Sequence, residues 1–260
     1  MYLQKIVAKK NTDPAFLEGR VIDWEDKLSD KLPPRISLSQ SLREGAREGI
    51  SIIAEMKRAS PSKGRFPFKG SVQEQIRAYD RGGARAISVL TNGPFFQGKL
   101  SDLSEAREST KLPLLRKDFL TEIWEIPQAK HYGADSILLI AGILDERELN
   151  RMITKAHECD LEALLEIHDK EELSRVLNLN TAPDAIGINN RNLRSFEVDL
   201  DTTARLSERI PEEICRVSES GFAERPDILK YRATVDAFLI GEALMRSSTP
   251  EQTLQAWVKG

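Results

Sequence analysis

Two lysines and several carboxylates stand directly behind short apolar runs, an arrangement that favours acid–base chemistry. Glu55 and Lys57 follow the apolar residues 52–54, and Lys117 follows a second apolar run further along the chain. Runs of this kind are typical of strands that are buried on both faces. Charged groups are costly inside a core, but they are well placed at an edge where several strands end. A solvated strand end explains any one of these segments, whereas the recurrence of the pattern favours a shared site.

The recurrence extends to six apolar runs, which end in acidic, basic, amide or glycine residues. If these ends meet at one edge, the following side chains converge there: Glu55, Lys57, Lys117, Glu166, Asn189, Arg191, Glu219 and Ser220. Two lysines and up to three carboxylates in one cleft perturb one another's pKa values, which acid–base catalysis exploits. Some of these groups are expected instead to hold the edge rigid through ion pairs and other polar contacts. Glu55 and Asn190, the residue after Asn189, are the first candidates for this structural role.

The elements that position these groups alternate between strand and helix. The apolar runs predict strands at 51–56, 86–90, 112–115, 136–140, 161–167, 185–188, 214–217 and 235–240. Amphipathic stretches predict helices at 72–81, 102–109, 123–131, 145–159, 170–178, 200–209, 225–231 and 250–258. Eight such repeats predict an α/β fold with parallel strands, a single (β/α)8 TIM barrel, in which chemistry takes place at the carboxyl ends of the strands.

Residues 1–48 predict an N-terminal helical extension of one or two helices. Leu3 and Ile6 repeat at helical spacing, and Leu38 and Leu42 do so again. The extension is expected to pack on the barrel of residues 49–260 as part of a single domain, although a separate flap remains an alternative. The sequence shows no linker of low complexity.

The composition narrows the classes of function. With 40% hydrophobic residues, 30% charged residues and a net charge of −3, the chain suits a globular enzyme and offers no basic field for nucleic acid. The two cysteines, Cys159 and Cys215, and the three histidines show no metal-ligand spacing. No apolar run approaches the roughly 18 residues of a membrane span. We expect a cytoplasmic monomer without a membrane or nucleic-acid partner.

The last two strand ends contain glycine, as phosphate sites often do. Gly221 follows the seventh strand, and Gly241 follows the eighth. In barrels of this class, the loops after these two strands commonly bind phosphate through backbone N–H groups. Ser60 in the first loop adds a hydroxyl group. The sequence therefore predicts a phosphorylated small-molecule substrate.

Longer motifs resemble a known family. They are IIAEMKRASPSKG (52–64), LLRKDF (114–119), ALLEIHD (163–169), IGINNRNLRSFEVDL (186–200), SESGF (218–222) and DAFLIGEALM (236–245). In this order they closely resemble indole-3-glycerol phosphate synthase of tryptophan biosynthesis. The resemblance implies a carboxy-lyase, a decarboxylase of aromatic amino-acid biosynthesis that acts on 1-(2-carboxyphenylamino)-1-deoxyribulose 5-phosphate. It also implies that the reaction needs no metal and no organic cofactor.

The resemblance also implies roles for individual residues. It makes Lys117 the general acid, Lys57 the ligand of the substrate carboxylate, and Glu166 the acid–base carboxylate. It places Glu55 with Lys57, and it assigns substrate hydroxyls and lysine orientation to Asn189 and Glu219. The remaining substrate-binding residues are Arg191, for the carboxylate or to brace Glu55; Ser60, Ser220, Gly221, Gly241 and Glu242, for the phosphate; and Phe96, Phe119, Leu138 and Leu193, for the aromatic ring. Glu242 is expected to act through its backbone N–H, because its carboxylate would repel phosphate.

Some alternatives remain open at this point. The proton transfers can be divided between Lys57 and Lys117 in either way. A neighbouring phosphate-binding barrel, phosphoribosylanthranilate isomerase, would need a Cys/Asp pair at strand ends, where neither cysteine is expected. A barrel that only binds ligand would be favoured by the loss of Lys117 or Glu166, and both are present. Docking on another enzyme of the pathway is not decided by the sequence.

Overall fold

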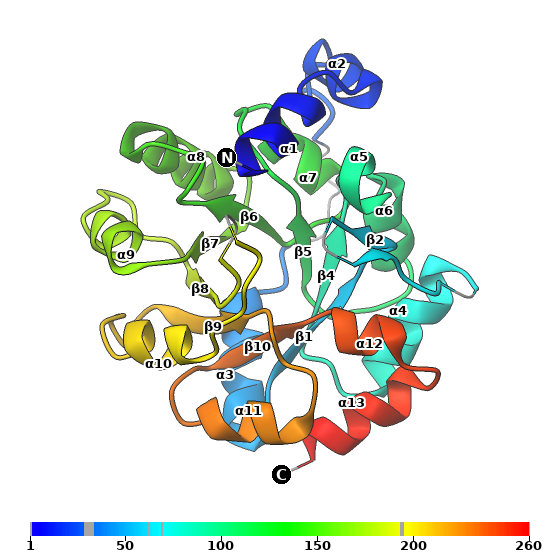
Figure 1. The fold of residues 1–260 in the computed structure, drawn as a ribbon. Coiled ribbons are helices and arrows are strands. Elements are labelled where there is room, and N and C mark those ends of the chain that lie inside the picture. Colours follow the sequence, from blue (N-terminus) through cyan, green and yellow to red (C-terminus); the bar gives the residue numbers. More distant parts are fainter. Residues whose placement is uncertain (1, 29–33, 62, 69, 193–194, 260) are drawn as a thin grey trace.

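Eight parallel strands close into a barrel, as the alternation of the sequence predicts (Figure 1). The computed structural model describes residues 2–28, 34–61, 63–68, 70–192 and 195–259. In their order around the barrel, the strands are β1 (Ile52–Met56), β10 (Ala237–Ile240), β9 (Cys215–Glu219), β8 (Ala185–Asn189), β7 (Glu162–Ile167), β6 (Ser136–Ile140), β5 (Leu114–Lys117) and β4 (Ala86–Leu90). After β1, strands β2 (Ala59–Ser60) and β3 (Gly64–Arg65) form a small antiparallel hairpin.

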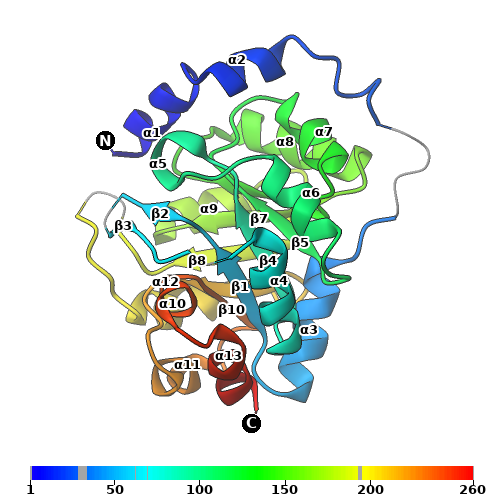
Figure 2. The ribbon, with the colours of Figure 1, turned by 90° about the vertical axis from the view of Figure 1, so that its right-hand side faces the viewer.

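Helices surround the barrel (Figures 1 and 2). The main helices that follow the eight barrel strands are α4 (Val72–Arg81), α6 (Ser101–Arg107), α7 (Glu125–His131), α8 (Glu146–Glu158), α9 (Lys170–Leu177), α10 (Asp201–Ser207), α11 (Arg225–Tyr231) and α13 (Pro250–Val258). Two short helices, α5 (Gly93–Phe96) and α12 (Glu242–Arg246), precede α6 and α13. Side chains of Ser71, Asp145 and Asp169 accept hydrogen bonds from first-turn N–H groups, which fixes where α4, α8 and α9 begin.

Three strands end later than their apolar runs. The predicted strand 185–188 continues to Asn189. The predicted strand 112–115 lies at Leu114–Lys117, and the predicted strand 214–217 continues to Glu219. The backbone ladder carries these strands onward, because Lys117 pairs with Leu90 and Glu219 pairs with Asn189. Lys117 and Glu219 are therefore the last residues of rigid strands.

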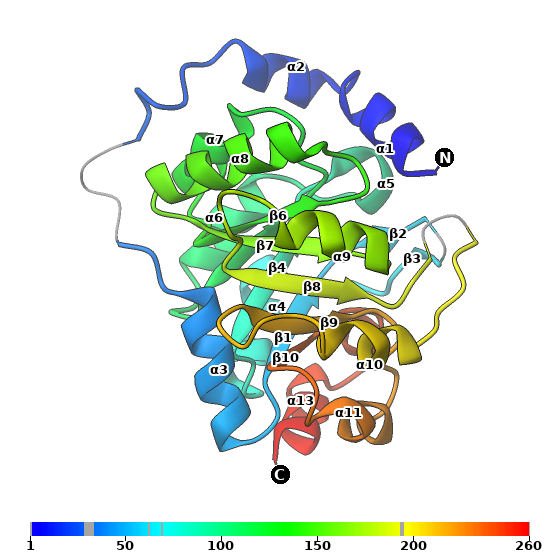
Figure 3. The ribbon, with the colours of Figure 1, turned by 90° about the vertical axis from the view of Figure 1, so that its left-hand side faces the viewer.

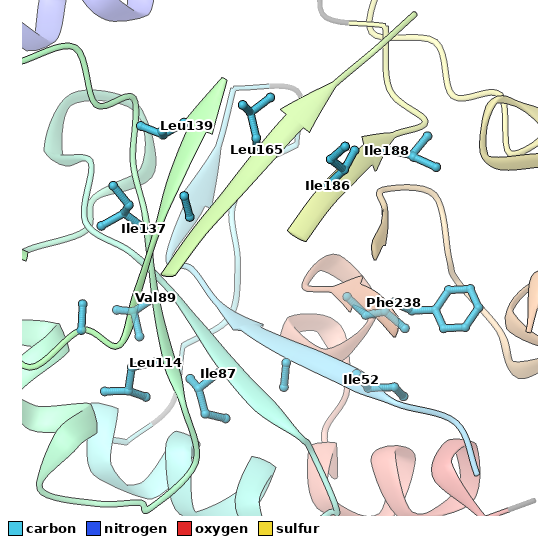
Figure 4. Packing of buried hydrophobic residues seen from close by; sticks show 14 of the residues in the cluster. Ile52, Ile87, Val89, Leu114, Ile137, Leu139, Leu165, Ile186, Ile188 and Phe238 are labelled. Carbon is cyan, nitrogen blue, oxygen red and sulfur yellow. The ribbon is translucent and has the colours of Figure 1, made fainter. Parts of the chain in front are cut away.

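The hydrophobic core has two layers. The outer layer lies between the strands and the helices and includes Ile87, Val89 and Ile186 (Figure 4). The inner layer fills the barrel with side chains such as Ile53, Leu115, Leu164 and Val217. These outward and inward residues alternate along each strand, because successive side chains of a strand point to opposite faces.

The described part of the N-terminal extension contains three helices, rather than one or two: α1 (Tyr2–Lys10), α2 (Pro14–Arg20) and α3 (Leu38–Glu48). The additional helix begins because Asp13 caps it and Pro14 occupies its first turn. Leu38 and Leu42 of α3 join the inner core layer at the amino ends of the strands. Helices α1 and α2 lie far from α3, next to α5 and α7 (Figure 3). Among the described residues, none of the helices is long and apolar enough to cross a membrane.

Candidate active site

One layer of charged side chains fills the carboxyl end of the barrel. Glu55, Lys117, Glu166 and Glu219 come from β1, β5, β7 and β9, which alternate around the barrel. Barrels of this class fill each interior layer with side chains from alternate strands. Where an ordinary layer is aliphatic, this one holds three carboxylates and one ammonium group, and all four residues are largely buried.

Lys117 holds two of these carboxylates together. Its Nζ lies 2.9 Å from Oε2 of Glu166 and 3.1 Å from Oε2 of Glu219. Glu219 has room for its carboxylate because residue 187 on the neighbouring strand is glycine. A Cβ atom at Gly187 would lie only 2.1 Å from Oε1 of Glu219. The position of this catalytic candidate therefore depends on the absence of one methyl group.

The shared ammonium group separates the pKa values of the two carboxylates. Burial raises the pKa of Glu166, but Lys117 and His168 outweigh it and hold that pKa well below its usual range. Burial raises the pKa of Glu219 to about 7, where repulsion from Glu166 adds to it and Lys117 opposes it. Burial lowers the pKa of Lys117, but attraction to Glu166, Glu219 and Glu55 raises it above its usual range. The site thus combines a protonated lysine with an ionised Glu166 and with Glu219, whose pKa is shifted in the opposite direction.

A second lysine–carboxylate pair lies next to this layer. Lys57 follows β1, and its Nζ lies 2.6 Å from Oε1 of Glu55. The ring of Phe66 lies beneath the same ammonium group, 5.6 Å away. Gly241 makes room for this pair, since a Cβ atom there would lie 2.3 Å from Oε1 of Glu55 and 3.0 Å from Nζ of Lys57. A loop glycine predicted for phosphate binding therefore also accommodates the Lys57–Glu55 pair.

Asn189, at the end of β8, orients Glu166. Its Nδ2 donates to Oε1 of Glu166 over 2.9 Å, and its Oδ1 accepts from the backbone N–H of Arg191. The Arg191 guanidinium donates to the carbonyl of Phe196, 3.1 Å away. Asn190 has another environment, where it contacts Ser218, Thr203 and the carbonyl of Ser220 in the wall of the barrel.

The glycine-containing loops after β9 and β10 also line the cleft at the barrel mouth. Ser220 and Gly221 both have positive φ angles, 69° and 96°. This turn needs Gly221, because a Cβ atom there would lie 2.5 Å from Val198. The carboxylate of Glu242 is engaged by Arg246 over 3.1 Å and by Lys63 over 3.7 Å. Both cations form ion pairs with the carboxylate of Glu242. The backbone N–H of Glu242 is therefore the group of this residue that can bind an anion.

A cavity of about 840 Å³ unites these groups. Its apolar wall includes Phe96 and Phe119, whose ring centroids are 5.9 Å apart. Leu3 and Ile6 of α1 also line it, so the N-terminal extension forms part of the mouth. The other predicted residues that line the cavity are Glu55, Lys57, Ser60, Lys117, Leu138, Glu166, Asn189, Arg191, Glu219, Ser220, Gly221, Gly241 and Glu242. The remaining predicted residue, Leu193, lies outside the described residues.

Comparison with known proteins assigns the family. The sequence profile described as "Indole-3-glycerol phosphate synthase" matches residues 3–257. A relative of that name from Koribacter versatilis (strain Ellin345) is 40% identical over 256 residues, which cover 97% of each chain. Another, from Desulfotalea psychrophila (strain LSv54 / DSM 12343), is 42% identical over 254 residues, covering 97% of this chain and 96% of its own. The chain belongs to the indole-3-glycerol phosphate synthase family.

A solved structure agrees with the fold. The chain resembles the crystal structure of 3-hexulose-6-phosphate synthase from Salmonella typhimurium with a TM-score of 0.63, over 81% of this chain and 97% of that chain. At 12% identity this likeness bears on the barrel architecture alone.

Sequence reasoning did not identify several residues of the site. Leu3 and Ile6 were visible as an apolar stripe, but nothing in their spacing indicated that the stripe faces the mouth. Gly187 lies inside an apolar run, where an isolated glycine often marks the close approach of another group. His168 follows Glu166 by two residues, and this spacing on a strand was the signal for a shared face. Among the residues that the structure describes, no cluster of three or more metal-ligating side chains occurs.

Proposed function

We propose that the charged layer at the barrel mouth carries out the reaction of the family, with the roles assigned below. As a member of the family, the chain is a carboxy-lyase of tryptophan biosynthesis. It converts 1-(2-carboxyphenylamino)-1-deoxyribulose 5-phosphate into indole-3-glycerol phosphate, carbon dioxide and water. The observation that carries the proposal is the buried Lys117 ammonium group between two carboxylates, in one cavity with Lys57 and an apolar wall.

In the first step, Lys117 acts as the general acid. The electron-rich ring carbon that bears the carboxylate attacks the ketone carbon, and the ketone oxygen takes a proton from Nζ of Lys117. The raised pKa of Lys117 keeps this proton in place until an alkoxide begins to form. Phe96 and Phe119 orient the aromatic ring and keep water away from the reacting carbons.

In the second step, the substrate carboxylate leaves. Lys57 binds this carboxylate, and Glu55 fixes the direction of the Lys57 side chain. The bond from the ring carbon to the carboxylate breaks, carbon dioxide departs, and the electron pair returns to the ring system. Arg191 lines the same cavity and adds positive charge for the departing group.

In the third step, the new hydroxyl group leaves as water. Glu166 removes a proton from the ring intermediate, and a lysine ammonium group protonates the departing hydroxyl. Asn189 keeps the Glu166 carboxylate in place, since it donates to Oε1. Glu219 holds the substrate hydroxyls and orients Lys117. Loss of one proton and one hydroxide from the substrate balances the water that is released.

The phosphate binds at the opposite side of the cavity. Ser60, Ser220 and the backbone N–H groups of Gly221, Gly241 and Glu242 are its proposed ligands. Because Arg246 and Lys63 neutralise the carboxylate of Glu242, this side chain does not oppose an anion in the pocket. Leu138 completes the apolar wall around the substrate ring.

We also propose that residues 1–48 and 49–260 act as one domain and that the chain is a monomer. Buried contacts between α1 and the barrel support the first point, since Lys10 pairs with Glu125 and donates to the carbonyl of Phe119. A phosphorylated substrate does not cross membranes freely, which favours a cytoplasmic site of action. Light scattering coupled to gel filtration tests the monomer.

The two cysteines bear on the alternative isomerase reaction. Cys215 begins β9 at the far end of the barrel, and Cys159 follows α8. Neither thiol can therefore serve as half of an acid–base pair at the mouth. The structure favours the synthase over the isomerase on this point.

The test is product fluorescence of wild type, Lys117→Ala and a control, Lys111→Ala, on an exposed lysine. We expect indole fluorescence to grow with wild type and the control, and to be almost absent with Lys117→Ala. Binding of inorganic phosphate should be the same in all three. Equal rates for the two variants would remove Lys117 from the mechanism, and binding without turnover in wild type would favour a binding module.

A further inference from the structure

His168 lies next to Glu166 and is not required by the mechanism above. Glu166 is the second-last residue of β7, and His168 follows directly after the strand. Nε2 of His168 is buried and lies 3.3 Å from Oε1 of Glu166, close enough for an ion pair but without the geometry of a hydrogen bond. His168 is not among the described residues that line the cavity, and Glu166 lies between its imidazole and the cavity residue Lys117.

A second carboxylate holds the other side of the ring. Oε2 of Glu172 lies 3.2 Å from Nδ1 of His168 and accepts the backbone N–H of the same residue over 2.8 Å. Glu172 is itself fixed in the first turn of α9, where its N–H donates to Asp169. Both ring nitrogens therefore face carboxylates. A neutral imidazole has one N–H group, and only the imidazolium form can donate to both sides.

We propose that His168 is a positioning residue that keeps Glu166 ionised and in place after Lys117 has given its proton to the substrate. The proposal rests on the roles proposed above for Lys117 and Glu166. Before ring closure, the Lys117 ammonium group balances Glu166 and Glu219. After ring closure, Lys117 is neutral, and Glu166 and Glu219 face each other without it, whereas Glu55 keeps its partner Lys57. His168 is a cation next to Glu166 that the proposed chemistry does not consume.

The charged groups around the pair agree with this assignment. Glu166 is faced by Lys117 from β5, by Asn189 from β8 and by Glu219 from β9, with Glu55 further across the layer on β1. His168 is faced by Glu166 and by Glu172 from α9. Burial lowers the pKa of His168, but these two carboxylates outweigh it and raise the pKa to about 10.

The first test observes the imidazole directly and does not depend on activity. Nitrogen-15 NMR of the intact protein reports whether both ring nitrogens carry protons, and loss of the signal in His168→Gln assigns it. We expect a doubly protonated ring at pH 8 in wild type, and a pKa lower by at least about one unit in Glu166→Gln. A His168 that titrates near the ordinary value of about 6.5 in wild type would overturn the proposal.

The second test separates positioning from folding. The variants are His168→Gln, Glu172→Gln and the control His157→Gln, whose imidazole pairs with Asp184 away from the site. We expect His168→Gln to lower kcat about tenfold to a hundredfold with KM nearly unchanged, and to move the acidic limb of the kcat profile to higher pH. Glu172→Gln should show a smaller change in the same direction.

The outcomes are distinct. A lower melting temperature with an unchanged shape of the kcat profile would make His168 a purely structural residue and refute the proposal. If wild type proved inactive toward the proposed substrate, the proposed function would fail, while the NMR experiment would still decide the charge of His168.

Discussion

Gly187 gives a sharp test of how closely the charged layer is packed. An alanine at this position of β8 would place a methyl group 2.1 Å from Oε1 and 3.2 Å from Cδ of Glu219. An ordinary contact begins near 3.4 Å, so the carboxylate oxygen has to move by more than about 1 Å. The methyl group meets its other neighbour, Leu164, at an ordinary 3.5 Å. Gly187→Ala therefore displaces one catalytic candidate and little else.

The expected effect falls on rate rather than on folding. The backbone of Gly187 is not in the left-handed region, so alanine adopts it, and the lower entropy of the unfolded chain contributes about 0.5 to 1 kcal/mol of stability. Moving the flexible end of Glu219 offsets this gain, and we expect the free energy of unfolding to change by less than about 1 kcal/mol. A misplacement of about 1 Å costs on the order of a hundredfold in rate.

Initial rates from indole fluorescence and thermal unfolding measure the two quantities. The matched control is Gly93→Ala, whose new methyl group would meet its nearest neighbours at 3.8 Å. We expect kcat/KM to fall about a hundredfold for Gly187→Ala and less than about threefold for the control. Full activity of Gly187→Ala would show that the position of Glu219 does not matter to the reaction, which would refute the reasoning.

Two further predictions concern stability. Burial raises the pKa of Glu219 from 4.5 to about 7, so the folded state binds this proton more tightly than the unfolded chain. The free energy of unfolding of wild type should therefore fall as the pH rises from 4.5 to 7. Glu219→Gln has no such titration. In urea unfolding, the free energy of unfolding of Glu219→Gln relative to wild type should therefore increase from pH 4.5 to 7 and level off above it. A difference that stays constant with pH would contradict the assignment. Lys10→Met leaves the buried Glu125 with the Arg116 guanidinium, 3.7 Å away, as its remaining ion-pair partner among the described residues, and should cost about 3 kcal/mol in the same assay. The exposed Lys9→Met is its control, and equal stability of the two variants would mean that α1 is not anchored through Lys10.

The barrel and its rim could be predicted from the sequence because both follow from the order of elements. Apolar runs located all eight barrel strands, and parallel topology then brought their carboxyl ends to one edge. The ends of β5 and β9 were placed too early, because hydrophobicity stops at Lys117 and Glu219 while the backbone ladder includes them. The sequence also did not separate α2 from its neighbours, since a capped helix of seven residues has too few apolar positions to show a period.

The pairing of groups within the site could not be predicted in the same way. Whether Lys117 meets Glu166, Glu219 or Glu55 depends on distances across the barrel, which no local pattern contains. The room that Gly187 leaves for Glu219 is likewise a contact between two strands. Sequence reasoning therefore identified which residues gather at the mouth, and the structure was needed to show which of them form ion pairs.

The electrostatics of the layer also bear on the order of the proposed steps. While Lys117 is protonated, the pKa of Glu166 lies well below its usual range, so Glu166 is a poor base and cannot take a proton from the substrate. Transfer of the Lys117 proton to the ketone oxygen removes the largest attraction that lowers the pKa of Glu166. The basicity of Glu166 therefore rises when ring closure has produced the intermediate that must be dehydrated. His168 limits this rise, because it leaves one positive charge beside Glu166 and prevents the buried carboxylate from trapping a proton before the intermediate offers one. In the proposed mechanism, the acid of the first step therefore also controls the strength of the base in the last.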